Sequence, residues 1–136
     1  MKRLLVGISV LCLFSGCKKM IEKIAEDMVM KAMTDGQWYV KDFVHNGTNI
    51  TTSFSAYKFQ YYRNKTVDAI NNGSVEKTGT WDGNASTMTT SANFTGATNP
   101  LNLINGNWKI DNNSWTFVEA TQNINGETKR MRLEKL

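Results

Sequence analysis

The sequence is poor in the residues that most catalytic and metal centres use. Its 136 residues contain two cysteines, Cys12 and Cys17, both close to the N-terminus, and one histidine, His45. A chain without cysteine beyond residue 17 has no disulfide framework, thiolate metal site or cysteine nucleophile in its main part. The single histidine stands beside an Asn-Gly turn at 46–47 and has no second histidine to share a metal with. We therefore interpret His45 as an exposed loop residue and expect no metal site.

Other catalytic patterns are missing as well. The acidic residues are spread along expected strands and turns, and sequence alone does not bring two of them to the separation that a carboxylate pair needs. No Gly-x-Ser-x-Gly motif or phosphate-binding loop is present. We therefore expect a protein that is not an enzyme and holds no cofactor. The acidic residues considered are Asp42, Asp68, Asp82, Asp111 and Glu119.

A strong excess of charge of one sign is also absent. The formal net charge is +4 at pH 7. Two basic residues, Lys2 and Arg3, belong to an N-terminal segment that we expect to be removed, while all 12 acidic residues follow it, which leaves +2. No basic stripe interleaved with aromatic residues is present. Nucleic acid is therefore not an expected partner.

The N-terminus carries an export signal. Lys2 and Arg3 precede an apolar run over residues 4–14. This run is too short to cross a bilayer as a helix, but its length and its basic flank are typical of a signal peptide. We predict that the mature protein leaves the cytoplasm.

The segment that ends this run resembles a bacterial lipobox. Residues 13–17 read Leu-Phe-Ser-Gly-Cys, with Phe14 at the position where leucine is commonest. The resemblance implies that residues 1–16 are cleaved and that Cys17 is the lipid attachment site, acylated by chains such as palmitate. Two or more acyl chains anchor a protein stably to a lipid bilayer. Two lysines follow the cysteine, whereas surface-exported lipoproteins of the resembled group tend to carry acidic residues there. We therefore expect a lipid-anchored outer-membrane protein that faces the periplasm, with the cell surface as the alternative.

The stretch 18–33 has the periodicity of an amphipathic helix. Its apolar residues recur at intervals of three and four, and Thr-Asp-Gly at 34–36 ends the pattern with a glycine suited to a helix C-terminus. We assign residues 17–35 to a lipidated N-terminus and helical linker. Three interpretations of the apolar face stay open: packing against the following domain, lying on the lipid surface, or docking onto an envelope protein partner. The apolar residues are Met20, Ile21, Ile24, Ala25, Met28, Val29 and Ala32.

From residue 37 onward the hydrophobic period changes to two. Asn-Gly and Asp-Gly pairs punctuate this region and favour tight β-turns. Because an open meander of this length would leave exposed edge strands, residues 36–136 are predicted to form one all-β domain, an eight-stranded antiparallel up-and-down barrel. The expected strands are 37–45, 54–62, 66–70, 75–81, 86–92, 107–110, 114–122 and 127–135.

A Gly-x-Trp motif occurs three times in this region. Glycine permits a sharp turn or the close approach of a neighbouring strand, and a tryptophan two residues later buries a large surface. We interpret the motifs as structural residues of a barrel floor. They pair Gly36 with Trp38, Gly79 with Trp81, and Gly106 with Trp108.

The order of these motifs resembles the lipocalin-like, calycin-type lipoproteins of Gram-negative bacteria. Trp-Tyr-Val at 38–40 lies on the first expected strand, Gly-Thr-Trp at 79–81 near the middle, Ile-Asn-Gly-Asn-Trp at 104–108 and Leu-Glu-Lys-Leu at 133–136. The resemblance covers nearly the whole mature chain. It implies a barrel and, at most, the binding of a small ligand whose identity it does not fix.

Aromatic residues on two expected strands are the candidates for a pocket wall. Tyr57, Phe59 and Tyr61 alternate on the second strand, and Trp115 and Phe117 on the seventh. If the barrel is open, these side chains would bind a small apolar or amphipathic ligand. If it is filled, the protein would be a non-catalytic envelope interaction module with a solid core. An interior cavity distinguishes the two functions.

Overall fold

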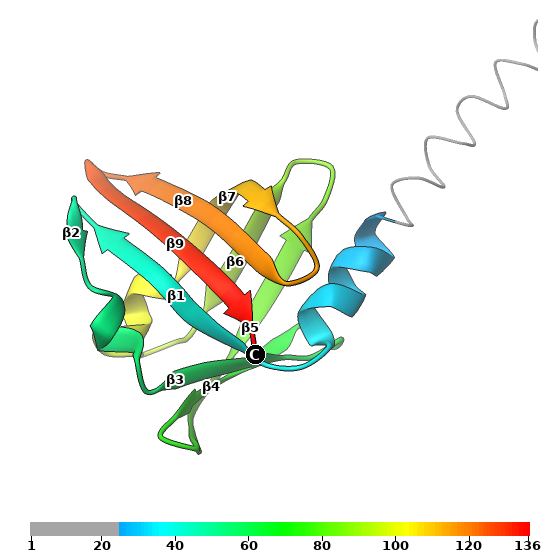
Figure 1. The fold of residues 1–136 in the computed structure, drawn as a ribbon, viewed down its shortest axis with the longest axis horizontal. Helices are drawn as coiled ribbons and strands as arrows, with labels where there is room; N and C mark the ends of the chain where they lie inside the picture. The colour runs from blue at the N-terminus through cyan, green and yellow to red at the C-terminus, as the bar shows by residue number, and fades with distance from the viewer. Residues whose placement is uncertain (1–24) are drawn as a thin grey trace, which may run out of the picture.

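The structure is a computed structural model that describes residues 25–136. The predicted signal peptide and the lipidation of Cys17 lie outside the described residues. Residues 25–34 form a helix, which is followed by nine strands in one sheet (Figure 1). The strands are β1 (Trp38–His45), β2 (Thr48–Asn49), β3 (Tyr57–Tyr61), β4 (Thr66–Asn71), β5 (Ser74–Asn84), β6 (Thr89–Asn93), β7 (Gly106–Asn113), β8 (Phe117–Ile124) and β9 (Glu127–Lys135).

The sheet closes on itself through its first and last long strands. Each long strand pairs antiparallel with the next, and β1 pairs with β9 from Trp38↔Lys135 to His45↔Lys129. The two-residue β2 pairs with β1 alone. Eight strands therefore form a closed antiparallel barrel, which confirms the predicted fold class and leaves none of these eight strands as an open sheet edge.

The predicted strands correspond one by one to the eight long strands, with differences at their ends. β6 begins three residues later than expected because the Asn84 Oδ1 accepts hydrogen bonds from the backbone N–H groups of Ser86 and Thr87, which holds 85–88 in a turn. β8 likewise begins at Phe117, after a turn in which the backbone N–H of Thr116 donates to the Ser114 Oγ. Short polar side chains that bond to nearby backbone compete with the sheet in this way.

One end of the barrel is filled by aromatic side chains; we call it the 3₁₀ end. Two 3₁₀ helices, η1 (Thr51–Phe54) and η2 (Leu101–Ile104), lie in the long connections on this side (Figure 1). Phe43 and Phe54 pack with ring centroids 4.8 Å apart. Tyr57, Phe59, Phe94 and Leu101 belong to the same buried core. Since one closed sheet encloses a hydrophobic core of its own, residues 25–136 meet the conditions for folding as a unit.

The helix at 25–34 covers the opposite end, the helix end. Met30 and Met33 pack against the barrel core. Gly36 follows with φ +78°, so the chain turns sharply into β1 through a conformation that glycine adopts readily. The described part of the helix thus packs on its own domain, the first of the three interpretations, although Met28 of the predicted apolar face is 50% exposed. Within 25–136, no helix has the length and hydropathy that a membrane crossing requires.

Candidate ligand cavity

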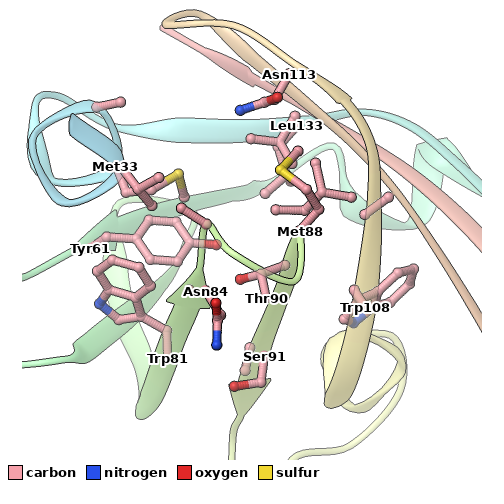
Figure 2. Close-up of a pocket in the computed structure, with 18 of the residues that line it drawn as sticks. Met33, Tyr61, Trp81, Asn84, Met88, Thr90, Ser91, Trp108, Asn113 and Leu133 are labelled. Carbon is pink, nitrogen blue, oxygen red and sulfur yellow. The ribbon is translucent and has the colours of Figure 1, made fainter. Parts of the chain in front are cut away.

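An apolar cavity of about 320 Å³ lies between the helix and the helix end of the barrel (Figure 2). Most of its apolar wall comes from three groups of side chains, and β3 adds Tyr61. The helix contributes Met28, Val29, Ala32 and Met33; β5 to β7 and their turn contribute Trp81, Met88, Ala92, Trp108 and Ile110; and β8, β9 and β1 contribute Val118, Ala120, Met131, Leu133 and Trp38. The barrel is thus solid at one end and hollow at the other, whereas the sequence analysis offered only an open or a filled barrel.

The three Gly-x-Trp tryptophans are buried, as their structural interpretation requires, and they also border the cavity. Trp38, Trp81 and Trp108 are at most 4% exposed. Each indole N–H donates to a backbone carbonyl outside the strands: Trp38 to Met33 at 3.0 Å, Trp81 to Tyr62 at 3.0 Å, and Trp108 to Ile104 at 2.7 Å. Trp38 therefore ties β1 to the helix, and Trp81 and Trp108 each tie a strand to a connection between strands. All three line the hollow part of the barrel, so they are cavity walls rather than a floor remote from it.

Two of the three motif glycines, Gly79 and Gly106, make the close approaches that the motif predicts, whereas Gly36 makes the sharp turn into β1. A Cβ added to Gly79 would overlap the backbone carbonyl of Asn93 and lie 2.7 Å from the Phe94 Cδ1. Gly106 has φ +107°, and a Cβ there would lie 2.7 Å from the Gln122 Nε2. Side chains at these positions would separate neighbouring strands.

Of the five aromatic pocket candidates, the cavity contacts Tyr61 alone. Tyr57 and Phe59 belong to the packed 3₁₀ end, with ring centroids 6.3 Å apart. The Tyr57 hydroxyl donates to Glu76, 2.9 Å from the Oε1. Burial and this bond to a carboxylate raise the pKa of Tyr57 to about 12. These two side chains do not line this cavity, because the end of the strand to which they belong is filled.

Trp115 and Phe117 do not reach the cavity either, which corrects the expected alternation of their strand. Trp115 lies in the turn before β8 and is 50% exposed. Phe117 is the first residue of β8, and its ring packs under the Arg132 guanidinium, whose Cζ is 4.2 Å from the ring centroid. Val118 and Ala120 line the cavity instead. The inward face of β8 is therefore one residue out of phase with the predicted face.

Sequence reasoning also missed a buried polar residue. Gln122 is 5% exposed. Its Nε2 donates to the carbonyls of Asn105 and Asn107, both at 3.1 Å, and its Oε1 accepts from the Lys129 Nζ at 3.0 Å. This amide thus provides the hydrogen-bond donor for the backbone carbonyls on either side of Gly106, where β7 begins. The even-numbered alternation of Val118, Ala120 and Gln122 was the signal that could have revealed the inward face.

Several ionisable side chains that the sequence analysis singled out form ion pairs in the described region. His45 is the last residue of β1 rather than a loop residue, and its Nε2 lies 3.4 Å from the Glu127 Oε1. Asp82 pairs with Lys65 at 2.8 Å, and Glu119 pairs with Arg132. Residues 25–136 contain no group of three or more His, Cys, Asp or Glu side chains placed to hold a metal ion.

Three solved structures share this fold. A DUF4847 family protein from Bacteroides vulgatus has a TM-score of 0.54 at 14% identity, covering 78% of this chain and 96% of its own. A lipocalin-like protein from Bacteroides uniformis has a TM-score of 0.54 at 11% identity, covering 76% and 98%. Japanin from Rhipicephalus appendiculatus, solved bound to cholesterol, has a TM-score of 0.55 at 8% identity, covering 79% and 78%.

The comparison defines a lipocalin-like barrel, as the motif order led us to expect. At these identities the likeness concerns the fold and not the ligand. No protein-family model matches the chain, and no curated protein sequence matches it.

Proposed function

We propose that this protein is a lipid-anchored, lipocalin-like binding protein of the bacterial envelope that holds a small apolar or amphipathic molecule. The cavity of about 320 Å³ under the helix is the observation that carries the proposal. Its volume falls within the range of small-molecule sites, and its wall is mostly aliphatic, aromatic and methionine side chains. Japanin, which shares the fold, was solved with cholesterol bound. A non-catalytic interaction module with a solid core fits less well, because only the 3₁₀ end is solid.

The anchor belongs to the same proposal. Acylated Cys17 would tie the chain to the bilayer eight residues before the described helix begins. We place the barrel on the periplasmic face of the outer membrane, where it would meet molecules that have already crossed that membrane. Protease shaving of intact cells tests this placement. Loss of the barrel domain while a periplasmic control protein stays intact would assign it to the cell surface instead.

Native mass spectrometry of the protein purified from its own host tests ligand binding. We expect a retained small molecule that denaturation releases. Ala32→Phe would project a ring from the helix into the cavity and should abolish the retained mass. Lys31→Phe adds the same ring at the neighbouring, exposed helix position and should keep it. A ligand-free mass in every preparation, together with no binding of added apolar molecules, would contradict the proposal.

A further inference from the structure

The cavity wall offers almost no ionisable chemistry. None of the side chains that the described residues contribute to it is a lysine, arginine, histidine, aspartate or glutamate. The exception among titratable groups is the Tyr61 hydroxyl, and burial raises its pKa well above the ordinary value for tyrosine. This hydroxyl is therefore neutral at physiological pH. A charged ligand group placed here would lose its hydration without gaining a counter-ion.

The Tyr61 hydroxyl is directed into the cavity. Tyr61 is 7% exposed, and its ring stands edge-on to Trp81 with centroids 5.3 Å apart. Figure 2 shows the hydroxyl pointing away from Trp81 into the space between Met33 and Thr90. Within residues 25–136, the one side-chain hydrogen bond that reaches Tyr61 ends on its backbone carbonyl, so the hydroxyl has no protein partner there. Buried hydroxyls usually have one.

Polar side chains on the facing wall are already engaged or more exposed. The Thr90 Oγ1 donates to the Asp82 carbonyl at 2.8 Å, and the Asn84 Oδ1 accepts two backbone N–H groups of its own turn. Ser91 is half-buried and Asn113 is exposed. The Tyr61 hydroxyl is thus the polar group of a buried side chain that a ligand in the cavity can reach.

We infer that the cavity selects neutral amphipathic molecules with an apolar body and a hydroxyl or carbonyl group that hydrogen-bonds to the Tyr61 hydroxyl, and rejects the matching anions. This inference rests on the proposed binding function and specifies its ligand class. A ligand hydroxyl or carbonyl satisfies the unpaired Tyr61 group without a desolvated charge. A carboxylate of the same body would be buried without a cation.

Matched ligands of one chain length separate these cases. Residues 18–136 contain the whole described helix and barrel, and we would load them with the neutral fluorescent probe N-phenyl-1-naphthylamine and displace it with decanol, decanoate or decane at neutral pH. Decanol should displace the probe at about tenfold lower concentration than decanoate. Tyr61→Phe should weaken decanol binding about three- to tenfold and leave decane binding unchanged. Tyr62→Phe is the matched control, because that neighbouring hydroxyl donates to Asp68 on the exposed surface, and it should behave as the unmodified chain.

Three results would overturn the inference while the proposed function stands: equal affinity for decanoate and decanol, unchanged decanol binding by Tyr61→Phe, or an equal loss of decanol and decane binding, which would make Tyr61 a packing residue only. If neither the probe nor any of the three ligands binds, the proposed function fails and the inference fails with it.

Discussion

The indole Nε1 of Trp38 donates a hydrogen bond to the backbone carbonyl of Met33 across 3.0 Å. This bond joins the first barrel strand to the last turn of the helix that covers the cavity. Trp38 is fully buried, and the Lys135 Nζ on the last strand lies 5.2 Å from its ring centroid. One side chain therefore connects the cover of the cavity with both strands that close the barrel.

Trp38→Ala should lower the free energy of unfolding by about 3 to 5 kcal/mol, since it removes a large buried aromatic side chain. Trp38→Phe keeps much of the packing but leaves the Met33 carbonyl without its donor, and should cost about 1 to 3 kcal/mol. Urea denaturation measures both, and amide hydrogen exchange should show faster exchange in 30–34 for Trp38→Phe. A loss below about 1 kcal/mol for Trp38→Ala would mean that the tryptophan is not a core residue.

Gly79→Ala should destabilise the barrel by about 1 to 3 kcal/mol or more, because its Cβ would overlap the Asn93 carbonyl on the paired strand. Gly83→Ala on the same strand is the control. Its Cβ would meet the Val29 Cγ1 of the helix at 3.3 Å, and a side chain at the edge of the cavity can move aside more easily than a paired strand. In thermal denaturation, Gly79→Ala should have a lower melting temperature than Gly83→Ala. The reverse order would contradict the close-approach role of Gly79.

The raised pKa of Tyr57 predicts a loss of folding stability in alkali. Its pKa rises from the ordinary 10.0 to about 12 on folding, because its hydroxyl is buried and donates to Glu76. The unfolded chain therefore releases this proton first. The stabilisation is fully present below pH 10 and is lost as the pH rises toward 12. Denaturant midpoints measured across this window should fall less steeply in Tyr57→Phe than in the unmodified protein. Identical slopes would show that Tyr57 ionises alike in both states.

Cys17→Ala should abolish acylation. We expect cells fed a labelled palmitate analogue to label the unmodified protein and not the variant, and we expect the variant to leave the detergent phase on partitioning. Two acyl chains on Cys17 would account for stable membrane association, so their loss should be evident without any change in the barrel. Equal mass and equal membrane association of the two proteins would refute the lipobox assignment.

The barrel could be predicted from the sequence because the signals for its turns and strands are local. Turn residues such as Asn46-Gly47 and Asn72-Gly73 sit between alternating runs, and each adopts the positive φ angles that tight hairpins require. The Gly-x-Trp motifs indicated buried positions, because tryptophan contributes a large apolar surface when it is buried. The helix followed from a period of three to four residues, and its end from the glycine at 36.

The cavity could not be located in the same way. Tyr57, Phe59 and Tyr61 share one face of one strand, yet the first two lie in the packed 3₁₀ end and the third faces the hollow end. The difference depends on where η1 and η2 fold back over the barrel, which is a tertiary event without a local signature. The prediction for Trp115 and Phe117 was wrong for another reason. The hydrogen bond between Ser114 and Thr116 makes β8 begin later than expected, and the opposite strand, β7, shifts register between Ile110 and Asn112.

The pairing of β1 with β9 decides where the molecule tolerates additions. The backbone N–H of Leu136 donates to the Gln37 carbonyl at 2.9 Å, so the last residue lies next to the junction between the helix and the first strand (Figure 1). An affinity tag or fluorescent protein fused there would crowd the cover of the cavity and distort any affinity measured with it. The hairpin tips at Gly47, Gly73 and Gly126 lie at the 3₁₀ end of the barrel, away from the helix. A Cβ at each of these glycines would meet no atom within 4 Å. Labels and surface attachments placed at these tips would leave the route into the cavity clear.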